Sequence, residues 1–89
     1  MYDSSYLYKP IQRMQDIAYC MVEEAIADNG NEVTRLNRHF EKHYQSLGRT
    51  NDDALKLDRA RTSCVMSSVM PELRDKFLDE AIREIDDVR

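Results

Sequence analysis

Apolar residues recur at spacings of three and four along most of the chain, which is the period of α-helices with one buried face. The first such stretch begins at Pro10, since proline is favoured in the first turn of a helix. It should stop at Asn29-Gly30, where Gly30 can take the left-handed conformation of a helix C-terminus. Its expected buried residues are Ile11, Met14, Ala18, Met21, Val22, Ala25 and Ile26.

Three more helices are expected, each with a start or stop signal. Asn31 can cap the second helix, which Gly48 closes, and Thr50 can cap a third helix that opens with two acidic residues. Pro71 removes a backbone donor and disfavours helix at Met70, so the third helix should end or kink there before a fourth begins. The expected apolar stripes are Val33, Leu36, Phe40, Tyr44 and Leu47; Ala54, Leu57, Ala60, Cys64, Val65 and Val69; and Leu73, Phe77, Leu78, Ala81, Ile85 and Val88.

The fold class that follows is all-α, in a single domain over residues 1–89. Only two glycines and two prolines occur among 89 residues, too few turn residues for a small β-barrel. Residues 1–9 lack a helical pattern and are expected to form an extended N-terminal arm, while residues 71–89 form an acidic C-terminal helix. Because stripes this broad exceed what a small bundle hides, we expect a homo-oligomer, with a monomeric four-helix bundle as the alternative.

Charge narrows the class of partner. The net charge is −4, which argues against DNA binding through phosphate contacts. Residues 35–61 nevertheless carry a net +3 and residues 71–89 a net −3, so a small anion could use the middle of the chain. No apolar run is long enough for a membrane span and no signal peptide is evident, so the cytoplasm is expected. Cys20 and Cys64 are interpreted as reduced thiols with a packing role.

Enzyme chemistry and metal binding are not expected. His39 and His43 share one helix face, but a third ligand is missing nearby, and Glu41 is not where the zinc-protease motif has its glutamate. Ser67, Ser68 and the cysteines fall inside helical runs without the turn that exposes a nucleophile. We therefore predict no catalytic residue, no metal and no cofactor.

The N-terminal segment is the unusual feature of the chain. It reads Ser5-Tyr6-Leu7-Tyr8-Lys9-Pro10, with Arg13 one helical turn further on. Bases stack on aromatic rings, and neighbouring cations and hydroxyls hold phosphate or ribose, so these residues suit a nucleotide. The competing interpretation is that the tyrosines pack on a neighbouring helix, and composition alone favours it.

Two segments resemble one family. Tyr6-Leu7-Tyr8-Lys9-Pro10 is similar to the aromatic-x-Tyr-x-Pro-Pro element of phage anti-CBASS proteins, which sequester cyclic oligonucleotide signals. Arg49-Thr50, followed by Ala54, Lys56-Leu57 and Ala60-Arg61, resembles the Arg-Thr, Ala, Lys-Leu and Ala-Lys pattern of a later helix in the family, most like the T-even phage form. Ile11 replaces the second proline, and residues 30–47 and the tail after Pro71 look like additions.

The resemblance implies a homohexamer that binds cyclic dinucleotides, such as cyclic GMP-AMP, between protomers without hydrolysis, in the cytoplasm of the infected bacterium. Tyr8 would stack on a base. The basic residue for the phosphates is open among Lys9, Arg13 and the basic middle, as is a second site for cyclic trinucleotides. The predicted ligand-binding residues are Ser5, Tyr6, Tyr8, Lys9, Pro10 and Arg13. The alternative function is a small helical interaction module, an adaptor or inhibitor that docks on a host protein.

Overall fold

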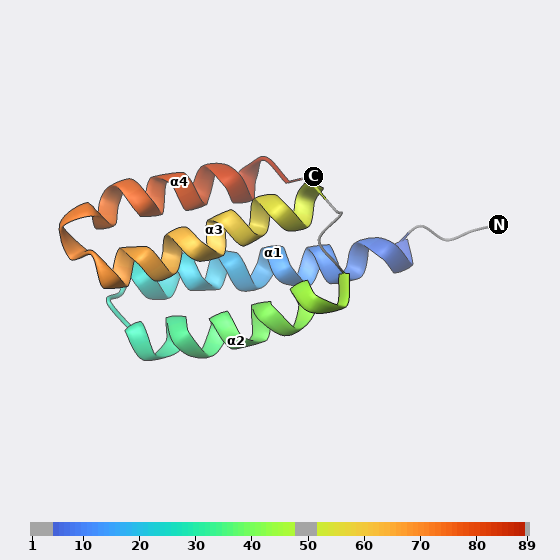
Figure 1. The fold of residues 1–89 in the computed structure, drawn as a ribbon, viewed down its shortest axis with the longest axis horizontal. Helices are drawn as coiled ribbons and strands as arrows, with labels where there is room; N and C mark the ends of the chain where they lie inside the picture. Colours follow the sequence, from blue (N-terminus) through green and yellow to red (C-terminus); the bar gives the residue numbers. More distant parts are fainter. Residues whose placement is uncertain (1–4, 48–51, 89) are drawn as a thin grey trace.

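Four α-helices run antiparallel, each to the next, in the computed structural model, which describes residues 5–47 and 52–88 (Figure 1). Side chains are described from Pro10 to Ser46 and from Asp52 to Val88. The helices are α1 (Ser5–Ile26), α2 (Gly30–Leu47), α3 (Asp52–Val69) and α4 (Arg74–Asp86), and the short 3-10 helix η1 (Pro71–Leu73) joins α3 to α4. The all-α prediction is confirmed for this part of the chain.

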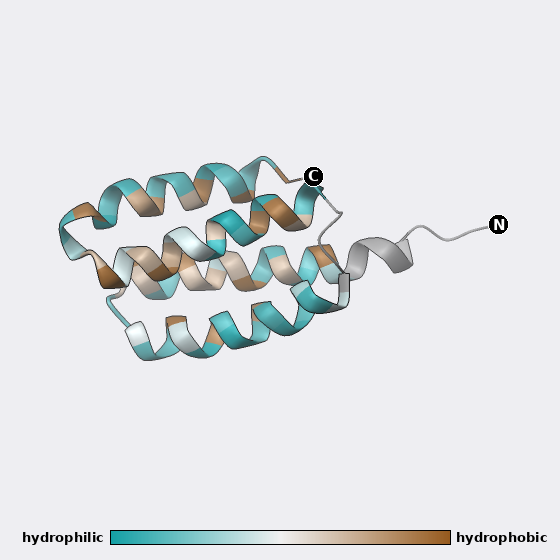
Figure 2. Ribbon diagram, in the orientation of Figure 1, coloured by the Kyte–Doolittle hydropathy of each residue, from teal (hydrophilic) through white to brown (hydrophobic). Residues whose placement is uncertain are grey.

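Helices α1 and α3 form the centre of the bundle. They contact each other, and α2 packs against one side of this pair while α4 packs against the other. Within the described residues α2 and α4 do not contact each other. All four helices run along the long axis (Figure 1), and the bundle measures 50 × 22 × 19 Å. Hydrophilic residues cover the outer sides of α2 and α4 (Figure 2).

The apolar stripes of all four helices meet in one core. Phe40, Met14, Met21, Leu57, Ile85 and Cys64 are the largest side chains that are fully buried in it. A single chain therefore covers most of the stripes that the sequence analysis expected a second subunit to cover. This is the packing that the monomeric alternative describes, and the core by itself gives no reason for association.

The expected extended arm is wrong for residues 5–9, because α1 begins at Ser5 and not at Pro10. Leu7 lies four residues before Ile11 and seven before Met14, so the helical period of the buried face continues upstream of the proline. Pro10 lacks only the one N–H that would bond to the carbonyl of Tyr6, and the helix spans that gap. Residues 1–4 lie outside the described part.

A Schellman motif ends α1 and centres on Asp28. Asp28 has a φ of 60°, the left-handed conformation that usually selects glycine. The N–H of Asn29 donates to the Glu24 carbonyl at 2.8 Å, and the N–H of Asp28 donates to the Ala25 carbonyl at 3.1 Å. These two bonds satisfy carbonyls that the end of the helix would otherwise leave free.

The expected roles of Gly30 and Asn31 are therefore wrong. Gly30 is the first residue of α2, where a Cβ would meet nothing within 4 Å. Asn29 precedes the helix, and its carbonyl accepts from the N–H of Val33 at 3.1 Å. The sequence suggested Gly30 as the left-handed residue that ends α1. The backbone bonds of the Schellman motif instead place Asp28 at that position.

The break at Pro71 is confirmed. Met70 leaves the helical conformation with φ −121° and ψ 77°, as expected for a residue whose neighbour's ring obstructs it. After η1 the chain reverses, and Arg74 donates through Nη2 to the carbonyl of Ala25 at 2.6 Å and to that of Ile26. This side chain ties the start of α4 to the end of α1. The expected Thr50 cap lies outside the described residues.

Four residues with an expected packing role are exposed instead. Ile26 and Val69 are 57% and 66% exposed, because each lies at the last position of its helix, where the chain turns away from the core. Leu73, at the end of η1, is 38% exposed. Cys20 is an exposed free thiol, whereas Cys64 is a buried free thiol as expected. Leu47 has no described side chain.

Candidate functional site

The predicted ligand-binding residues lie in the first three turns of α1. Ser5, Tyr6, Tyr8 and Lys9 belong to this helix, although their side chains are outside the described set. Pro10 is half-buried and the Arg13 side chain is exposed. The helix start extends beyond the neighbouring helices (Figure 1).

A helical start changes the spatial relation between these residues. In an extended arm Lys9 and Arg13 would be far apart, but in α1 residues four apart lie on one face with Cβ atoms about 5–6 Å from each other. Ser5, Lys9 and Arg13 follow this spacing. Ile11, three residues after Tyr8, is buried in the core. The helical backbone therefore places these three positions on one face of α1.

The end of α4 holds this part of α1 in place. Gln15 Nε2 donates to the carbonyls of Ile85 at 3.1 Å and Val88 at 3.4 Å. One turn further, Tyr19 Oη donates to Asp86 Oδ1 at 2.5 Å, and this hydrogen bond is the main reason that the pKa of Tyr19 is raised. The sequence analysis missed both contacts, since they join residues at least 67 positions apart.

Two of the candidate phosphate contacts in the basic middle are already occupied. Arg35 pairs with Glu32 at 2.7 Å on the surface of α2. Arg61 pairs with Glu41 at 2.6 Å and also with Asp58. Carboxylates already neutralise both guanidinium groups, so neither is a ready site for a phosphate. Arg49 lies outside the described residues.

Arg61 instead organises the contact between α2 and α3. Its side chain is only 16% exposed, and the guanidinium carbon lies 5.1 Å from the ring centre of Phe40 and 5.9 Å from that of Tyr44. Burial lowers the pKa of this group, but the hydrogen bonds to Asp58 and Glu41 outweigh burial and raise it. Arg61 therefore stays charged and has a structural role.

The outer face of α2 keeps an exposed basic stripe. Arg38 and Lys42 are exposed and four residues apart, and exposed His39 lies between them. None of the described ion pairs involves these two cations. The net +3 of residues 35–61 signalled this stripe, but the sequence alone did not separate Arg38 and Lys42 from the paired arginines.

Two shallow hollows lie elsewhere, along α3. One, of about 410 Å³, is lined by Asp52, Leu55, Lys56, Asp58 and Arg59. The other, of about 330 Å³, lies between α3 and α4 and is lined by Arg59, Thr62, Ser63, Glu80 and Glu84. Neither includes Pro10 or Arg13, and both mix acidic with basic groups.

Metal-binding and membrane-spanning features are absent from the described part of the chain. No group of three or more His, Cys, Asp or Glu side chains there is arranged to hold a metal ion. Likewise, none of the helices in residues 5–47 and 52–88 has the length and apolar character needed to cross a membrane.

The fold is an antiparallel four-helix bundle in which the start of α1 extends beyond the other helices. Compared with known proteins, the chain matches no family model, no curated protein and no solved structure. The resemblance to anti-CBASS proteins therefore depends on the two motifs, and the function is argued below from the residues themselves.

Proposed function

We propose that the protein binds cyclic dinucleotides such as cyclic GMP-AMP at the first three turns of α1. It would sequester them without hydrolysis and so block CBASS signalling in the cytoplasm of an infected bacterium. The observation that supports this proposal most is the placement of Ser5, Lys9 and Arg13 on one face of a helix whose start extends beyond the bundle. Tyr6 and Tyr8 flank that face in the sequence.

The chemistry of this face fits a cyclic dinucleotide. Such a ligand carries two phosphodiesters and two bases on a compact ring. Lys9 and Arg13, one turn apart on α1, would supply charge-assisted hydrogen bonds to the phosphates. Tyr8 supplies a ring on which a base can stack, worth roughly 1–3 kcal/mol. Capture by stacking and charge needs no nucleophile or metal.

In this proposal a second copy of the chain completes the site. One helix face covers only one side of a ligand, whereas tight small-molecule sites bury most of the ligand surface. A hexamer of the kind that the resemblance implies would bring several α1 ends together. Association would then serve the ligand site, since the core is already covered within one chain.

The test is calorimetric titration with cyclic GMP-AMP, with a mixture of GMP and AMP as the matched control. We expect saturable binding of the cyclic ligand, a raised melting temperature and an assembly larger than 10.5 kDa by light scattering. A cyclic trinucleotide titrated into the saturated protein tests for a second site. No heat and no thermal shift with any cyclic dinucleotide or trinucleotide would sink the proposal.

A further inference from the structure

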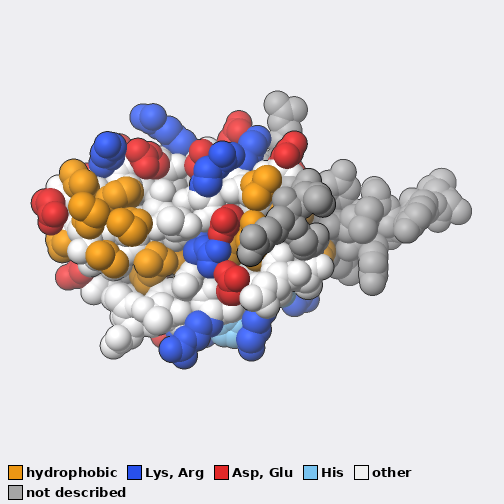
Figure 3. All heavy atoms as spheres, viewed as in Figure 1, with side chains coloured by type: hydrophobic (Ala, Val, Ile, Leu, Met, Phe, Trp, Pro, Cys, Tyr) orange, Lys and Arg blue, Asp and Glu red, His pale blue; other side chains and the backbone are white. Residues whose placement is uncertain are grey.

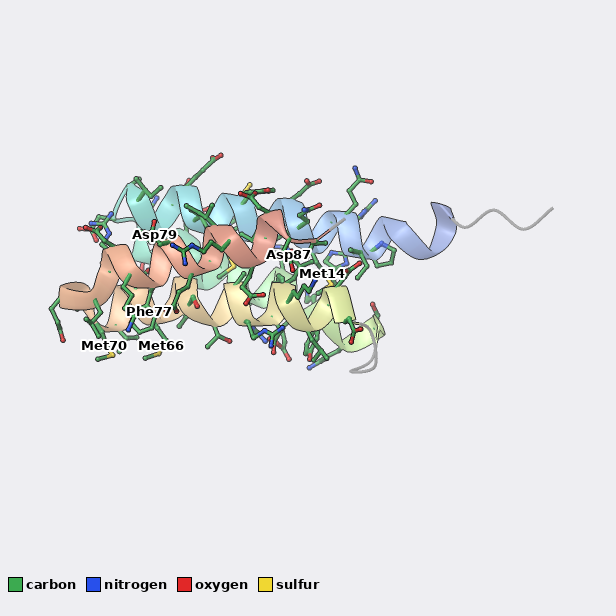
Figure 4. The ribbon with its side chains drawn as sticks, turned by 90° about the horizontal axis from the view of Figure 1, so that it is seen from above. Met14, Met66, Met70, Phe77, Asp79 and Asp87 are labelled. Atoms are coloured by element: carbon green, nitrogen blue, oxygen red, sulfur yellow. The ribbon has the colours of Figure 1, made fainter. Side chains whose placement is uncertain are left out.

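The bundle end opposite the start of α1 carries an apolar surface that the nucleotide proposal does not use. It consists of Met66 on α3, Met70 after α3, Leu73 at the end of η1 and Phe77 on α4, and is called the Met-Phe patch below. None of the four side chains is buried, and Leu73 is 38% exposed. Figure 3 shows apolar side chains gathered at this end of the molecule. Figure 4 shows the side chains of Met66, Met70 and Phe77 on the same side of the α3–α4 pair.

The Met-Phe patch continues into the hollow between α3 and α4. Ser63 on α3 lines the hollow and lies three residues before Met66, so both share one helix face. On α4, Glu80 lines the hollow and lies three residues after Phe77. The two helices therefore border one surface that is apolar at one end and polar at the other, and we call it the α3–α4 groove.

The dimensions of the groove match a helix. From Arg59 to Val69, the last residue of α3, the groove follows ten residue steps, about 15 Å at a rise of 1.5 Å per residue, or nearly three helical turns. Methionine and phenylalanine side chains accept apolar anchors that a partner helix presents at i, i+3 or i+4, and i+7. Amphipathic helices commonly bind in hydrophobic grooves of this kind on a partner protein.

The charge of the groove selects a basic helix. Glu80 and Glu84 line its polar end against one cation, Arg59, whose Nε is 3.8 Å from Glu84 Oε2. Glu80 and Glu84 carry two negative charges and Arg59 carries one positive charge, so the residues that line this end have an excess of negative charge. Residues 71–89, which supply α4, add a net charge of −3. A lysine or arginine of a partner would find complementary charge here.

We propose that the α3–α4 groove docks a basic amphipathic helix of another protein, its apolar residues on the Met-Phe patch and its cations at Glu80 and Glu84. A second copy of this chain fits less well. Two copies joined patch to patch by a two-fold axis would leave both polar ends uncovered, and full antiparallel overlap would place each apolar end on the other's carboxylates. This inference does not depend on nucleotide binding at α1.

The first test uses synthetic peptides of about 15 residues on the full chain. The probe carries leucines at helical spacing and lysines on one flank. One control has the same composition in scrambled order, and another has glutamates in place of the lysines. We expect fluorescence anisotropy to show saturable binding of the probe, with binding at least about 10-fold weaker for both controls. Equal binding of the scrambled peptide would show charge attraction without docking and overturn the proposal.

Variants then locate the site. Met66→Gln with Met70→Gln should weaken probe binding about 10-fold, whereas Met66→Leu with Met70→Leu keeps an apolar surface and should bind like the parent. Glu80→Lys should weaken binding, and Glu23→Lys, an exposed charge change on α1, should not. If the Met→Gln pair instead dissociates an oligomer by light scattering and leaves probe binding unchanged, the groove is occupied by a second copy and the proposal is wrong.

Discussion

The guanidinium of Arg61 lies over the ring of Phe40, with 5.1 Å between the guanidinium carbon and the ring centre. The contact joins α3 to α2 across a part of the core where the Arg61 side chain is only 16% exposed. The same guanidinium also pairs with two carboxylates, Glu41 and Asp58, so one side chain links the aromatic face to acidic groups on both helices.

Arg61→Ala should therefore lower the free energy of unfolding by about 2–3 kcal/mol, through the lost cation–π contact and the lost charge-assisted hydrogen bonds. Arg61→Lys should recover part of this, since it keeps the charge but not the planar group. Urea denaturation followed by circular dichroism measures both. Arg38→Ala, at an exposed arginine, is the matched control and should change stability by no more than about 0.5 kcal/mol. Equal effects of the two alanine variants would contradict the structural role of Arg61.

The left-handed conformation of Asp28 makes a stabilising substitution available. Asp28→Gly should raise the free energy of unfolding by about 0.5–1 kcal/mol, because glycine adopts a φ of 60° without a Cβ penalty. Asp28→Ala should not stabilise, since alanine keeps the Cβ and loses the polar side chain. Urea melts of the two variants give the comparison, and a Gly variant no more stable than the Ala variant would argue against a left-handed residue here.

The two cysteines should differ in reactivity toward a thiol reagent. Cys20 is exposed, whereas burial raises the pKa of the Cys64 thiol to about 12. We expect one thiol per native chain to react within seconds to minutes, and the second only on the timescale of unfolding. Cys20→Ser should abolish the fast phase. Fast labelling of both thiols in the native protein would show that Cys64 is accessible.

The Cys64 thiol should also make stability depend on alkaline pH. In the unfolded chain this thiol ionises near its ordinary pKa of 9.0, but in the folded protein only near 12. Because the folded pKa is the higher one, the stabilisation is complete below pH 9 and is lost as pH rises towards 12. Cys64→Ala should show a shallower decline over that window. Both proteins should carry Tyr19→Phe, since the pKa of Tyr19 is raised as well, chiefly by its hydrogen bond to Asp86.

Tyr8 is the sharpest test of the nucleotide proposal. Tyr8→Ala should weaken binding of cyclic GMP-AMP by about 5- to 150-fold, since it removes a stacking face, and Tyr8→Phe should bind nearly as the parent does. Calorimetric titration of both variants beside their melting curves separates stacking from packing. A loss of stability without a direct loss of affinity would favour the packing interpretation. A Tyr8→Ala protein with full affinity would remove Tyr8 from the site.

Helix positions were predictable where one residue decides the outcome alone. Pro71 ended a helix as expected, because its ring and missing donor act locally at Met70. The start of α1 was not predicted, since proline at the sixth helical position is tolerated and the apolar period runs through it. The turn at Asp28 was placed two residues late because Gly30 is the residue with the stronger turn preference, while the backbone bonds chose another register.

The residue types of the candidate site come from the sequence, and their relative placement comes from the structure. The sequence contained Ser5, Lys9 and Arg13, yet their positions share one face only once α1 is helical through residue 9. Likewise, seven bases in residues 35–61 looked equivalent in the sequence. Asp58 is a local partner of Arg61 on α3, but only the packing of α2 on α3 brings Glu41 to Arg61 and so distinguishes it from Arg38 and Lys42. Tertiary contacts of this kind have no local signal.

The bonds from Gln15 to the carbonyls of Ile85 and Val88 have a consequence for the order of folding. Helices α1 and α2 form one local hairpin and α3 and α4 another, and each can close soon after its own residues are available. The contact between Gln15 and the end of α4 spans at least 70 positions, and closing such a long loop costs conformational entropy. Only the docking of the two hairpins forms enough contacts to offset that cost. We expect docking to limit the folding rate, and the contact of Gln15 with the end of α4 to form in that last step.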